Sequence, residues 1–421
     1  MGNIDGKGKN VVMKFGGSSI ATPERMRKVA EHIKSTREKG RRVVVVLSAM
    51  GDTTDDLIKL AEENYKGVIP DVLRGELDKL LVTGEEQSVS LLALALASLD
   101  VPAISLTSRE IQLEASAVGR VKMIKGNNLI KGELDKGKVV IVTGFQGIKV
   151  SGSVRVITTL GRGGSDVTAV CLAAVCGCCC ENYTDVDGIY ATDPRVVPNA
   201  KRFEHISYHQ LTQLASVGGG KLMDRAVLLA QNLGVIIRVM LSPSFGTSTG
   251  GTVVCSGSTL SKIEVEESQA GLAIQRLNMV RISHVPNQPG AAAKIYNALH
   301  KINLRGSIQA PAKEREASIS ILFSDSVSQE VQTALAMLKA DIMPSIKIST
   351  LETLAVLTLV DPLMDDRPGY LRDVCDALGE AEINIVSQAS PGITIEVMVG
   401  LKDLNVAAEV IAAKFNLINE S

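Results

Sequence analysis

The feature that most constrains the fold is an alternation of short apolar segments with helical segments along roughly the first 260 residues. The run RRVVVVLSAMG at 41–51 is too uniformly apolar for a strand with one face in water, so we expect it inside a parallel sheet. In the preceding segment, Thr22 has the position of an N-cap, Pro23 of a first helical residue and Gly40 of a helix end. Further strands are expected at 10–15, 101–106 and 138–147, and further helices at 53–65, 73–99 and 166–177. The alternation predicts an α/β fold, a three-layer αβα sandwich with a mostly parallel central sheet.

The last 150 or so residues contain an internal duplication instead. The segments 284–304 and 364–385 each have a Pro-Gly turn, then Ala-Leu, then Ile-Asn, and Gly290 and Gly369 are 79 residues apart. Apolar strand runs flank each copy, at 279–285 and 317–323 in the first and at 354–360 and 393–399 in the second. The pattern predicts a small α+β unit of the βαββ type, present twice.

These patterns divide the chain into three expected domains. The first occupies residues 1–265, and the two repeats occupy 270–345 and 346–421. The apolar periodicity lapses into serine, glycine and acidic residues at 256–269, where we place the linker.

Charge and composition limit the classes of partner. Lysine and arginine number 45 against 46 aspartates and glutamates, so no basic surface is expected for nucleic acid or a lipid membrane, and a small-molecule partner is favoured. The apolar stretch at 88–106 contains serines, Asp100 and Pro102, which indicates a buried helix followed by a strand. The first ten residues lack the apolar core of a secretory signal, so we expect a cytoplasmic protein.

Seven cysteines, an odd number, argue for reduced thiols rather than a disulfide framework. Four of them lie in CGCCC at 176–180. A zinc site would need a second pair with the appropriate spacing elsewhere, and the sequence has none, so packing at a helix end and strand is the favoured interpretation over a metal role.

Two glycine-rich stretches carry charged groups next to predicted strands. MKFGGSS at 13–19 offers backbone N–H groups and the Lys14 cation to a phosphate, although such turns also serve simply as tight connections. LGRGGSD at 160–166 is a second turn of this kind, and it contains Arg162 and Asp166. Arginine can bind a carboxylate or phosphate with two hydrogen bonds, whereas a carboxylate can orient a lysine, an amine or a metal-bound water. A solvated Arg–Asp pair that caps the helix is the alternative, but two such turns in one sheet indicate two anionic ligands that meet beyond the strand ends.

A third stretch, YTDVDGIYATDPRVVP at 183–198, is expected to be a loop because of its glycine and Asp-Pro punctuation. Its tyrosines could stack on a nucleotide base, and its acids could meet ribose or magnesium. Ordinary loop polarity is the alternative explanation.

These motifs, taken together, resemble the aspartokinases. KFGGSS, LSAMGDTTDDLI, LLVTGEEQS, VTGFQG, TTLGRGGSD, YTDVDGIYATDPRVVP and ISYHQLTQLASVGG occur in the family's order, and the C-terminal repeats resemble its paired, ferredoxin-like ACT domains. The resemblance covers nearly the whole chain and implies the amino-acid kinase fold. It also implies that ATP, with Mg²⁺, phosphorylates the side-chain carboxylate of L-aspartate to 4-phospho-L-aspartate, the first step toward lysine, threonine, methionine and diaminopimelate. Because a carboxylate is already a nucleophile at neutral pH, such a reaction needs positioning and charge neutralisation but no general base.

The resemblance also implies roles for individual residues. Lys14 would neutralise the transferring phosphoryl group, Asp166 would hold Lys14 or the substrate in register, and Arg162 would grip the α-carboxylate of aspartate. Glu85 would meet the substrate amine. The other substrate positions that match the family are Ser48, Thr54, Phe145, Thr159 and Ser165. The other ATP positions are Gly16, Gly17, Ser18, Thr184, Asp185, Tyr190, Arg195 and Lys221, and no residue is assigned as a metal ligand.

Some positions depart from the family pattern. The family's second ATP lysine falls on Gly220, with Lys221 one residue late, and the segment 107–123 differs from the usual substrate-side sequence. Two alternatives follow: a related kinase that acts on another carboxylate, or a catalytically weak regulatory subunit that binds amino acids. The ACT resemblance implies an amino-acid effector, lysine or threonine among the candidates, and a homodimer or larger assembly. The candidate effector residues are Asn287, Gly290 and Gln309.

Overall fold

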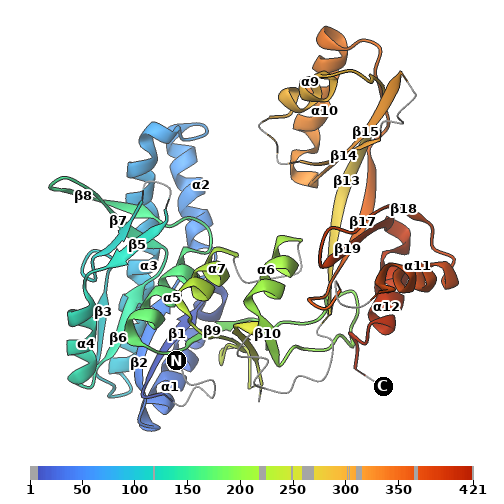
Figure 1. Ribbon diagram of the computed structural model, residues 1–421. Helices are drawn as coiled ribbons and strands as arrows, with labels where there is room; N and C mark the ends of the chain where they lie inside the picture. Colours follow the sequence, from blue (N-terminus) through green and yellow to red (C-terminus); the bar gives the residue numbers. More distant parts are fainter. Residues whose placement is uncertain are drawn as a thin grey trace. The chain divides into compact units, whose positions relative to one another are not determined.

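The computed structural model describes residues 8–116, 119–217, 224–247, 250–257, 270–300, 302, 304–309, 315–364 and 368–419. The chain forms two compact units, and in Figure 1 the first is coloured blue to yellow-green while the larger part of the second is coloured yellow to red. Unit 1 consists of Met1–Tyr190, Arg202–Ser216 and Gly220–Gln269, and unit 2 of Ala191–Lys201, Val217–Gly219 and Ala270–Ser421. Most of the expected linker, 258–269, lies outside the described residues.

An eight-stranded sheet forms the centre of unit 1, in the order β10-β12-β11-β9-β1-β2-β6-β3. Neighbouring strands are parallel except β11 and β12. The strands are β1 (Asn10–Phe15), β2 (Arg42–Leu47), β3 (Ala103–Leu106), β6 (Val139–Thr143), β9 (Cys180–Thr184), β10 (His205–Ser207), β11 (Ile237–Leu241) and β12 (Thr252–Cys255). The chain leaves β1 toward β2 on one side and reaches β9 on the other, so the carboxyl end of β1 is a topological switch point, where ligands bind in such sheets.

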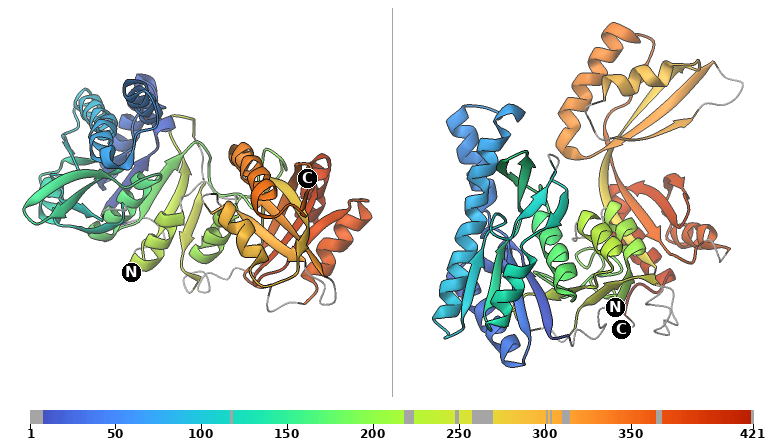
Figure 2. Two further views of the ribbon diagram at one scale, coloured as in Figure 1. Left: turned by 90° about the horizontal axis from the view of Figure 1, so that it is seen from above. Right: turned by 60° about the vertical axis from the view of Figure 1, so that its left-hand side comes forward.

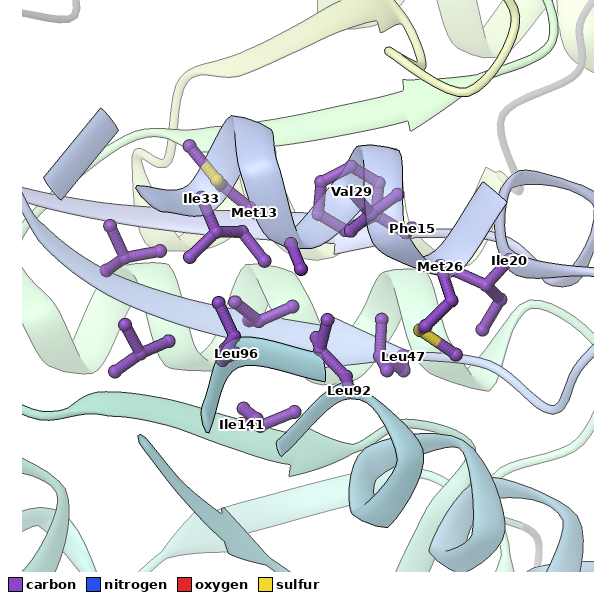
Figure 3. Close-up of a cluster of buried hydrophobic side chains, with 14 of the residues drawn as sticks. Met13, Phe15, Ile20, Met26, Val29, Ile33, Leu47, Leu92, Leu96 and Ile141 are labelled. Carbon is purple, nitrogen blue, oxygen red and sulfur yellow. The ribbon is translucent and has the colours of Figure 1, made fainter. Parts of the chain in front are cut away.

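Helices cover both faces of this sheet (Figure 2). On one face, α1 and α3 pack over β1, β2 and β6, and their side chains form a continuous apolar core around Phe15 and Leu92 (Figure 3). On the other face, α5 packs against β1 and β2, and α7 packs against α5. The helices of unit 1 are α1 (Pro23–Glu38), α2 (Thr53–Tyr65), α3 (Arg74–Ala97), α4 (Asn127–Asp135), α5 (Gly164–Cys176), α6 (Tyr208–Ser216) and α7 (Asp224–Leu233). The predicted αβα sandwich is confirmed.

Local sequence signals act where expected in unit 1. The side-chain oxygen of Thr22 accepts a hydrogen bond from the backbone N–H of Arg25, and Pro23 begins α1. Gly40 has φ +82°, the left-handed conformation that suits glycine after a helix. Of the described helices, Asp71–Ala97, which includes α3, is long and apolar enough to cross a membrane, but α3 packs against α1, β3 and β6 as a core helix.

A smaller four-stranded sheet has the order β5-β4-β7-β8, and its strand β8 packs against α3. Its strands are β4 (Leu113–Ala115), β5 (Val121–Ile124), β7 (Gln146–Ser151) and β8 (Val154–Thr159). The β7 and β8 strands form an antiparallel hairpin that returns the chain to the glycine-rich turn at 160–166. This hairpin therefore positions one of the two predicted anion-binding turns.

Unit 2 contains the duplicated segments as two lobes on one sheet, in the order β14-β15-β13-β17-β19-β18. The long strand β13 (Gly271–Pro286) joins the lobes, because its first half pairs with β17 and its second half with β15 (Figure 1). The first lobe also contains α9 (Ala291–Ala298), β14 (Arg305–Gln309), β15 (Glu316–Phe323), α10 (Ser328–Met337) and β16 (Lys347–Ile348). The second contains β17 (Glu352–Val360), α11 (Tyr370–Glu380), β18 (Ile385–Ala389), β19 (Thr394–Gly400) and α12 (Leu404–Lys414).

Candidate active site

The candidate site lies where β1, β2, β6 and β9 end and α5 begins. The turn after β1 and the turn after β2 touch: the N–H of Gly51 donates to the carbonyl of Gly17 at 3.1 Å. A Cβ atom on Gly17 would lie 2.6 Å from the carbonyl oxygen of Ala49, closer than real contacts allow. Gly17 therefore permits the two turns to meet and brings their polar groups together.

Lys14, near the end of β1, pairs with Asp166, in the first turn of α5. The Lys14 Nζ lies 2.7 Å from the Asp166 Oδ1, and both side chains are 12% exposed. The positive end of the α5 dipole favours a carboxylate at this position. The two predicted anion-binding turns thus contribute one charge each to a single, largely buried ion pair.

Asn182 on β9 is a third member of this cluster that the sequence analysis missed. Lys14 and Asn182 are directly paired across parallel β1 and β9. The Asn182 Nδ2 donates to the Asp166 Oδ1 at 3.3 Å, and since a carboxylate only accepts, this contact fixes the orientation of the amide. The Asn182 side-chain oxygen is buried and has no hydrogen-bond partner among the described residues. The alternation of side chains along β9 was the available signal, because it places Asn182 on the face opposite to Tyr183, but it does not say which element covers that face.

Two serines predicted to line the substrate side lie in contact. The Ser48 hydroxyl, after β2, donates to the Ser165 hydroxyl, at the start of α5, at 3.0 Å. Gly144, after β6, allows this approach, because a Cβ there would lie 2.5 Å from the Ser165 Oγ. Thr54, also predicted for the substrate side, is half-buried in the first turn of α2.

Glu85 is buried on α3, with its side chain against the turn after β2. Its Oε1 accepts a hydrogen bond from the backbone N–H of Ala49 at 3.1 Å, and its Oε2 has no partner among the described residues. Burial raises the pKa of the Glu85 carboxyl to about 7, although the Ala49 N–H partly opposes that effect. A buried acid with one free oxygen can accept a hydrogen bond from a cationic substrate group.

Thr159, at the end of β8, is held by an acid that the sequence analysis missed. Asp78 on α3 accepts hydrogen bonds from the Thr159 hydroxyl at 2.9 Å, the Thr159 N–H at 3.2 Å and the Thr158 hydroxyl at 3.2 Å. Arg74 pairs with Asp78 at 3.2 Å. Asp78 and Glu85 are seven residues apart, and therefore on one face of the helix, which was the available sequence signal.

The glycine-rich turn at 160–166 is anchored at its start. Arg225 on α7 donates to the carbonyls of Leu160 and Gly119, each at 2.7 Å. The N–H of Leu160 also donates to the carbonyl of Phe145, whose φ is +63°. Arg162 itself is exposed, so its guanidinium is available at the surface of the turn. Gly161 and Gly163 have φ +75° and +72°, a conformation that explains the glycines.

The turn after β1 differs from the expected strand-to-helix junction. Gly17–Ile20 forms a short 3-10 turn, and α1 starts only at Pro23. Gly16 is extended, Ser18 is exposed, and the Ser18 carbonyl accepts a hydrogen bond from Arg25 at 2.8 Å. The predicted phosphate cradle is thus a 3-10 turn followed by a separately capped helix.

The predicted nucleotide loop is partly strand and partly loop. Thr184 ends β9, and its hydroxyl donates to the Asp185 carboxylate at 3.0 Å. The Tyr190 hydroxyl donates to Asp187, which also pairs with Arg202 at 2.8 Å. These contacts order the loop from Thr184 to Tyr190 within unit 1.

The suggestion that Tyr183 stacks on a base is wrong. Tyr183 lies within β9, is 3% exposed, and stacks on Phe15 with ring centroids 4.7 Å apart. Its hydroxyl contacts Glu181 and His32. The strand continues two residues further than the punctuation of the sequence indicated, which places this ring in the core.

The other predicted residues lie in unit 2 or outside the residues that the structure describes. Arg195 is exposed in the segment that belongs to unit 2 and pairs with Asp193 at 2.7 Å. Gly290 precedes α9 with φ +87°, and Asn287 is exposed beside it. Gln309 ends β14. Gly220 and Lys221 lie outside the described residues.

Comparison with known proteins bears on this geometry. Residues 9–241 match the amino acid kinase family. The chain is 36% identical over 416 residues to the aspartokinase of Corynebacterium efficiens, and the matched region covers 97% of this chain and 96% of that protein. It is 37% identical over 417 residues to the aspartokinase of Mycolicibacterium smegmatis, with 97% and 96% covered. The chain belongs to the aspartokinase family.

A solved aspartokinase structure is similar over the same extent. The structure of E. coli aspartokinase III in complex with aspartate and ADP superposes with a TM-score of 0.68 at 25% sequence identity, covering 96% of this chain and 99% of that one. The present chain is therefore an α/β enzyme of this family. Near the carboxyl ends of its central strands lie the Lys14 ammonium, the Asp166 and Glu85 carboxylates, and the Ser48 and Ser165 hydroxyls.

Proposed function

We infer that the protein transfers the γ-phosphoryl group of ATP to the side-chain carboxylate of L-aspartate, which gives ADP and 4-phospho-L-aspartate. The observation that carries this inference is the buried Lys14–Asp166 pair at the switch point of the sheet, in a chain of the aspartokinase family. A cation held at that point can neutralise the charge that spreads over a transferring phosphoryl group.

The residues around this pair support a division of labour. We propose that Lys14 contacts the phosphoryl group while Asp166 fixes the direction of its ammonium. The turn from Gly16 to Ser18 faces the phosphates, and the loop from Thr184 to Tyr190, with Asp185, faces the nucleoside. Lys221 would supply a second cation to the phosphates.

We propose that the substrate binds between the turn after β2 and the start of α5. Glu85 would accept the aspartate ammonium through its free oxygen, and exposed Arg162 would take the α-carboxylate in a two-point contact. Ser48 and Ser165 would orient the side-chain carboxylate. The remaining pocket residues are Thr54, Phe145 and Thr159, the last fixed by Asp78.

Mg²⁺ is proposed to enter with the nucleotide. Among the described residues, no three histidine, cysteine, aspartate or glutamate side chains form a metal-binding group. Mg²⁺ in kinases is usually held by substrate phosphates and one or two carboxylates rather than by an all-protein cage, and the acids of the loop at 183–198, Asp185 among them, would meet the ion there. When bound, the ion would neutralise phosphate charge.

Unit 2 is proposed to regulate the reaction. Its two lobes carry the ACT resemblance, so we propose an amino-acid effector, lysine or threonine, bound near Asn287, Gly290 and Gln309. We also propose a homodimer or larger assembly and a cytoplasmic location. The solved structure of E. coli aspartokinase III in complex with lysine and aspartate, which is 24% identical in sequence, shares the fold of this chain with a TM-score of 0.75.

One assay tests the function and its alternatives. ADP release is measured with Mg²⁺ and ATP in the presence of aspartate or of other carboxylic amino acids. Release that depends on aspartate is the expected result. Release only with another acid would identify a related kinase of different specificity, and no release with any acid would indicate a regulatory subunit.

A further inference from the structure

The two-residue connection between β6 and β7 has a backbone conformation that is unusual for an aromatic residue. The N–H of Gln146 donates to the carbonyl of Gly144 at 2.7 Å, so the chain makes a three-residue γ-turn with Phe145 in the middle. Phe145 has φ +63°, and the γ-turn of this hand is rare and strained. Such a conformation persists only where the surrounding structure enforces it, so the neighbours of Phe145 must supply a constraint.

The side chain of Gln146 supplies this constraint. Its Nε2 donates to the Val82 carbonyl on α3 at 2.7 Å, and its Oε1 accepts from the Thr143 hydroxyl at 3.1 Å and the Ser108 hydroxyl at 3.4 Å. Gln146, Thr143 and Ser108 are completely buried. Because a carbonyl only accepts hydrogen bonds, the contact with Val82 fixes the orientation of the amide. Both ends of the Gln146 amide therefore have partners in the protein interior.

The backbone of Phe145 connects this amide to the glycine-rich turn at the start of α5. The N–H of Leu160 donates to the Phe145 carbonyl at 2.7 Å, directly beyond the Gln146–Thr159 pair of the β7–β8 hairpin. A Cβ atom on Gly164, the first residue of α5, would lie 3.1 Å from the Phe145 Cα. Phe145 therefore contacts the glycine-rich turn near both of its ends, and its conformation determines where that turn lies.

Helix α3 holds both strands of this hairpin. Asp78 accepts hydrogen bonds from the end of β8, whereas the Val82 carbonyl accepts one from Gln146 on β7. Positions 78, 82 and 85 are four and three residues apart, so Glu85 lies along the same side of the helix. One side of α3 thus contains the proposed partner of the aspartate ammonium and also holds the hairpin that leads to the glycine-rich turn.

We propose that Gln146 is a positioning residue for aspartate: its buried amide holds the γ-turn at Phe145 and, through it, the turn that contains Arg162. This proposal rests on the function proposed above, in which Arg162 takes the α-carboxylate of aspartate. Gln146 itself does not reach the substrate, because its side chain is enclosed and hydrogen-bonded in the interior. The proposed ATP residues lie on other segments, so the loss of this amide should weaken aspartate binding more than ATP binding.

The kinetics of Gln146→Met in the full-length protein test the proposal. Methionine keeps the length of the side chain but removes its hydrogen bonds. We expect the KM for aspartate to rise about tenfold, while the KM for ATP changes by less than about twofold. Gln210→Met is the matched control, because Gln210 on α6 is also buried and the same substitution removes its amide. The control should keep the KM for aspartate of the unmodified protein even where its melting temperature falls.

A structural role without positioning gives a different result. A Gln146→Met enzyme with a lower melting temperature or a lower kcat, but with an unchanged KM for aspartate, would overturn the proposal. Equal rises in the KM values for aspartate and ATP would also overturn it, since the whole site would then be distorted. The proposed function is tested separately by the unmodified protein, which must release ADP in an aspartate-dependent manner. Without that release the proposed function fails, and the role of Gln146 fails with it.

A second variant covers the case in which Gln146→Met does not fold. Thr143→Val has a similar shape and removes one hydrogen-bond donor to the Gln146 Oε1. We expect the KM for aspartate to rise about threefold in this variant, again with little change in the KM for ATP. A folded Thr143→Val enzyme with an unchanged KM for aspartate would contradict the proposal.

A double variant tests whether Gln146 acts through the turn that contains Arg162. In an Arg162→Ala background, Gln146→Met should lower kcat/KM for aspartate by no more than about twofold, because the group that it positions is already absent. A loss of about tenfold in that background, equal to the loss in the unmodified background, would overturn the proposal, since the effects of residues that act independently are additive.

Discussion

The Lys14 ammonium lies 2.7 Å from the Asp166 carboxylate, and the pair is almost enclosed at the carboxyl end of β1. The two residues come from glycine-rich turns about 150 positions apart in the sequence, yet they form one ion pair because both turns end at the switch point of the same sheet. Asp166 lies in the first turn of α5, so the start of this helix fixes the direction in which the Lys14 ammonium points.

Loss of the cation should remove most of the phosphoryl transfer. We expect Lys14→Met to lower kcat for aspartate phosphorylation by about 100- to 1,000-fold, the usual cost of removing one group that stabilises transition-state charge. Lys28→Met is the matched control, because Lys28 forms an exposed ion pair with Glu24 on α1. Steady-state ADP release measures both, and a Lys14 variant with normal kcat would contradict the proposed role.

The amide of Asn182 should act through Asp166 rather than on the substrate. Asn182→Leu removes a hydrogen bond to a charged group, so we expect kcat to fall about tenfold while the KM for aspartate changes little. Asn64→Leu is the control, because the exposed Asn64 amide donates to the Leu60 carbonyl of its own helix, α2. A rise in KM with normal kcat would show that Asn182 serves substrate binding instead.

The charge state of Glu85 should control aspartate binding. Burial raises the pKa of Glu85 to about 7, so below that pH the free enzyme holds a neutral carboxyl that attracts an ammonium group weakly. We expect the KM for aspartate to fall as the pH rises through about 7, and Glu85→Gln to have a high KM that lacks this dependence. Glu63→Gln, at an exposed position on α2, should keep the dependence. A KM for aspartate that is constant across this range in the unmodified enzyme would contradict the proposal.

The same residue should link stability to pH. The native state retains the Glu85 proton between pH 4.5 and about 7, where the unfolded chain has lost it, so the free energy of unfolding falls as the pH rises through this window. Glu85→Gln cannot bind this proton. As the pH rises from 4.5 to about 7, the free energy of unfolding of the variant should therefore increase by about 3 kcal/mol relative to that of the unmodified protein. Urea unfolding of both proteins at pH 4.5 and at pH 7 measures this change. If the two free energies of unfolding differ by the same amount at both pH values, the raised pKa of Glu85 is ruled out.

Lys221 should take part in nucleotide binding if it replaces the family lysine. Lys221→Ala is then expected to lower kcat/KM for ATP by about 10- to 100-fold, the value of one charge-assisted contact. Lys39→Ala, at the exposed end of α1, is the control. Unchanged kinetics with ATP would exclude the assignment.

The effect of residues at helix ends and turns was the easiest to predict from the sequence. The Thr22 cap, Pro23 and the left-handed glycines act on their own backbone, so their effect could be read from neighbouring positions. Contacts between distant segments were less accessible: Asp78 binds Thr159 across 81 positions, and Asn182 reaches Asp166 only because β9 lies beside β1 and under α5. The sequence contained the helix face and the strand alternation, but not which face would meet which element.

By itself, the sequence determined the elements and their class, because apolar periodicity and the residues at helix ends act over a few positions. It determined the duplication as well, since the repeated Pro-Gly turn and helix are visible in the chain. Only the tertiary structure decided which polar groups share a site. In that structure Tyr183 lies in the core, residues 191–201 belong to unit 2, and Lys14 lies beside Asp166 and Asn182. These features were not predictable because burial and the order of strands in a sheet depend on the whole packed chain.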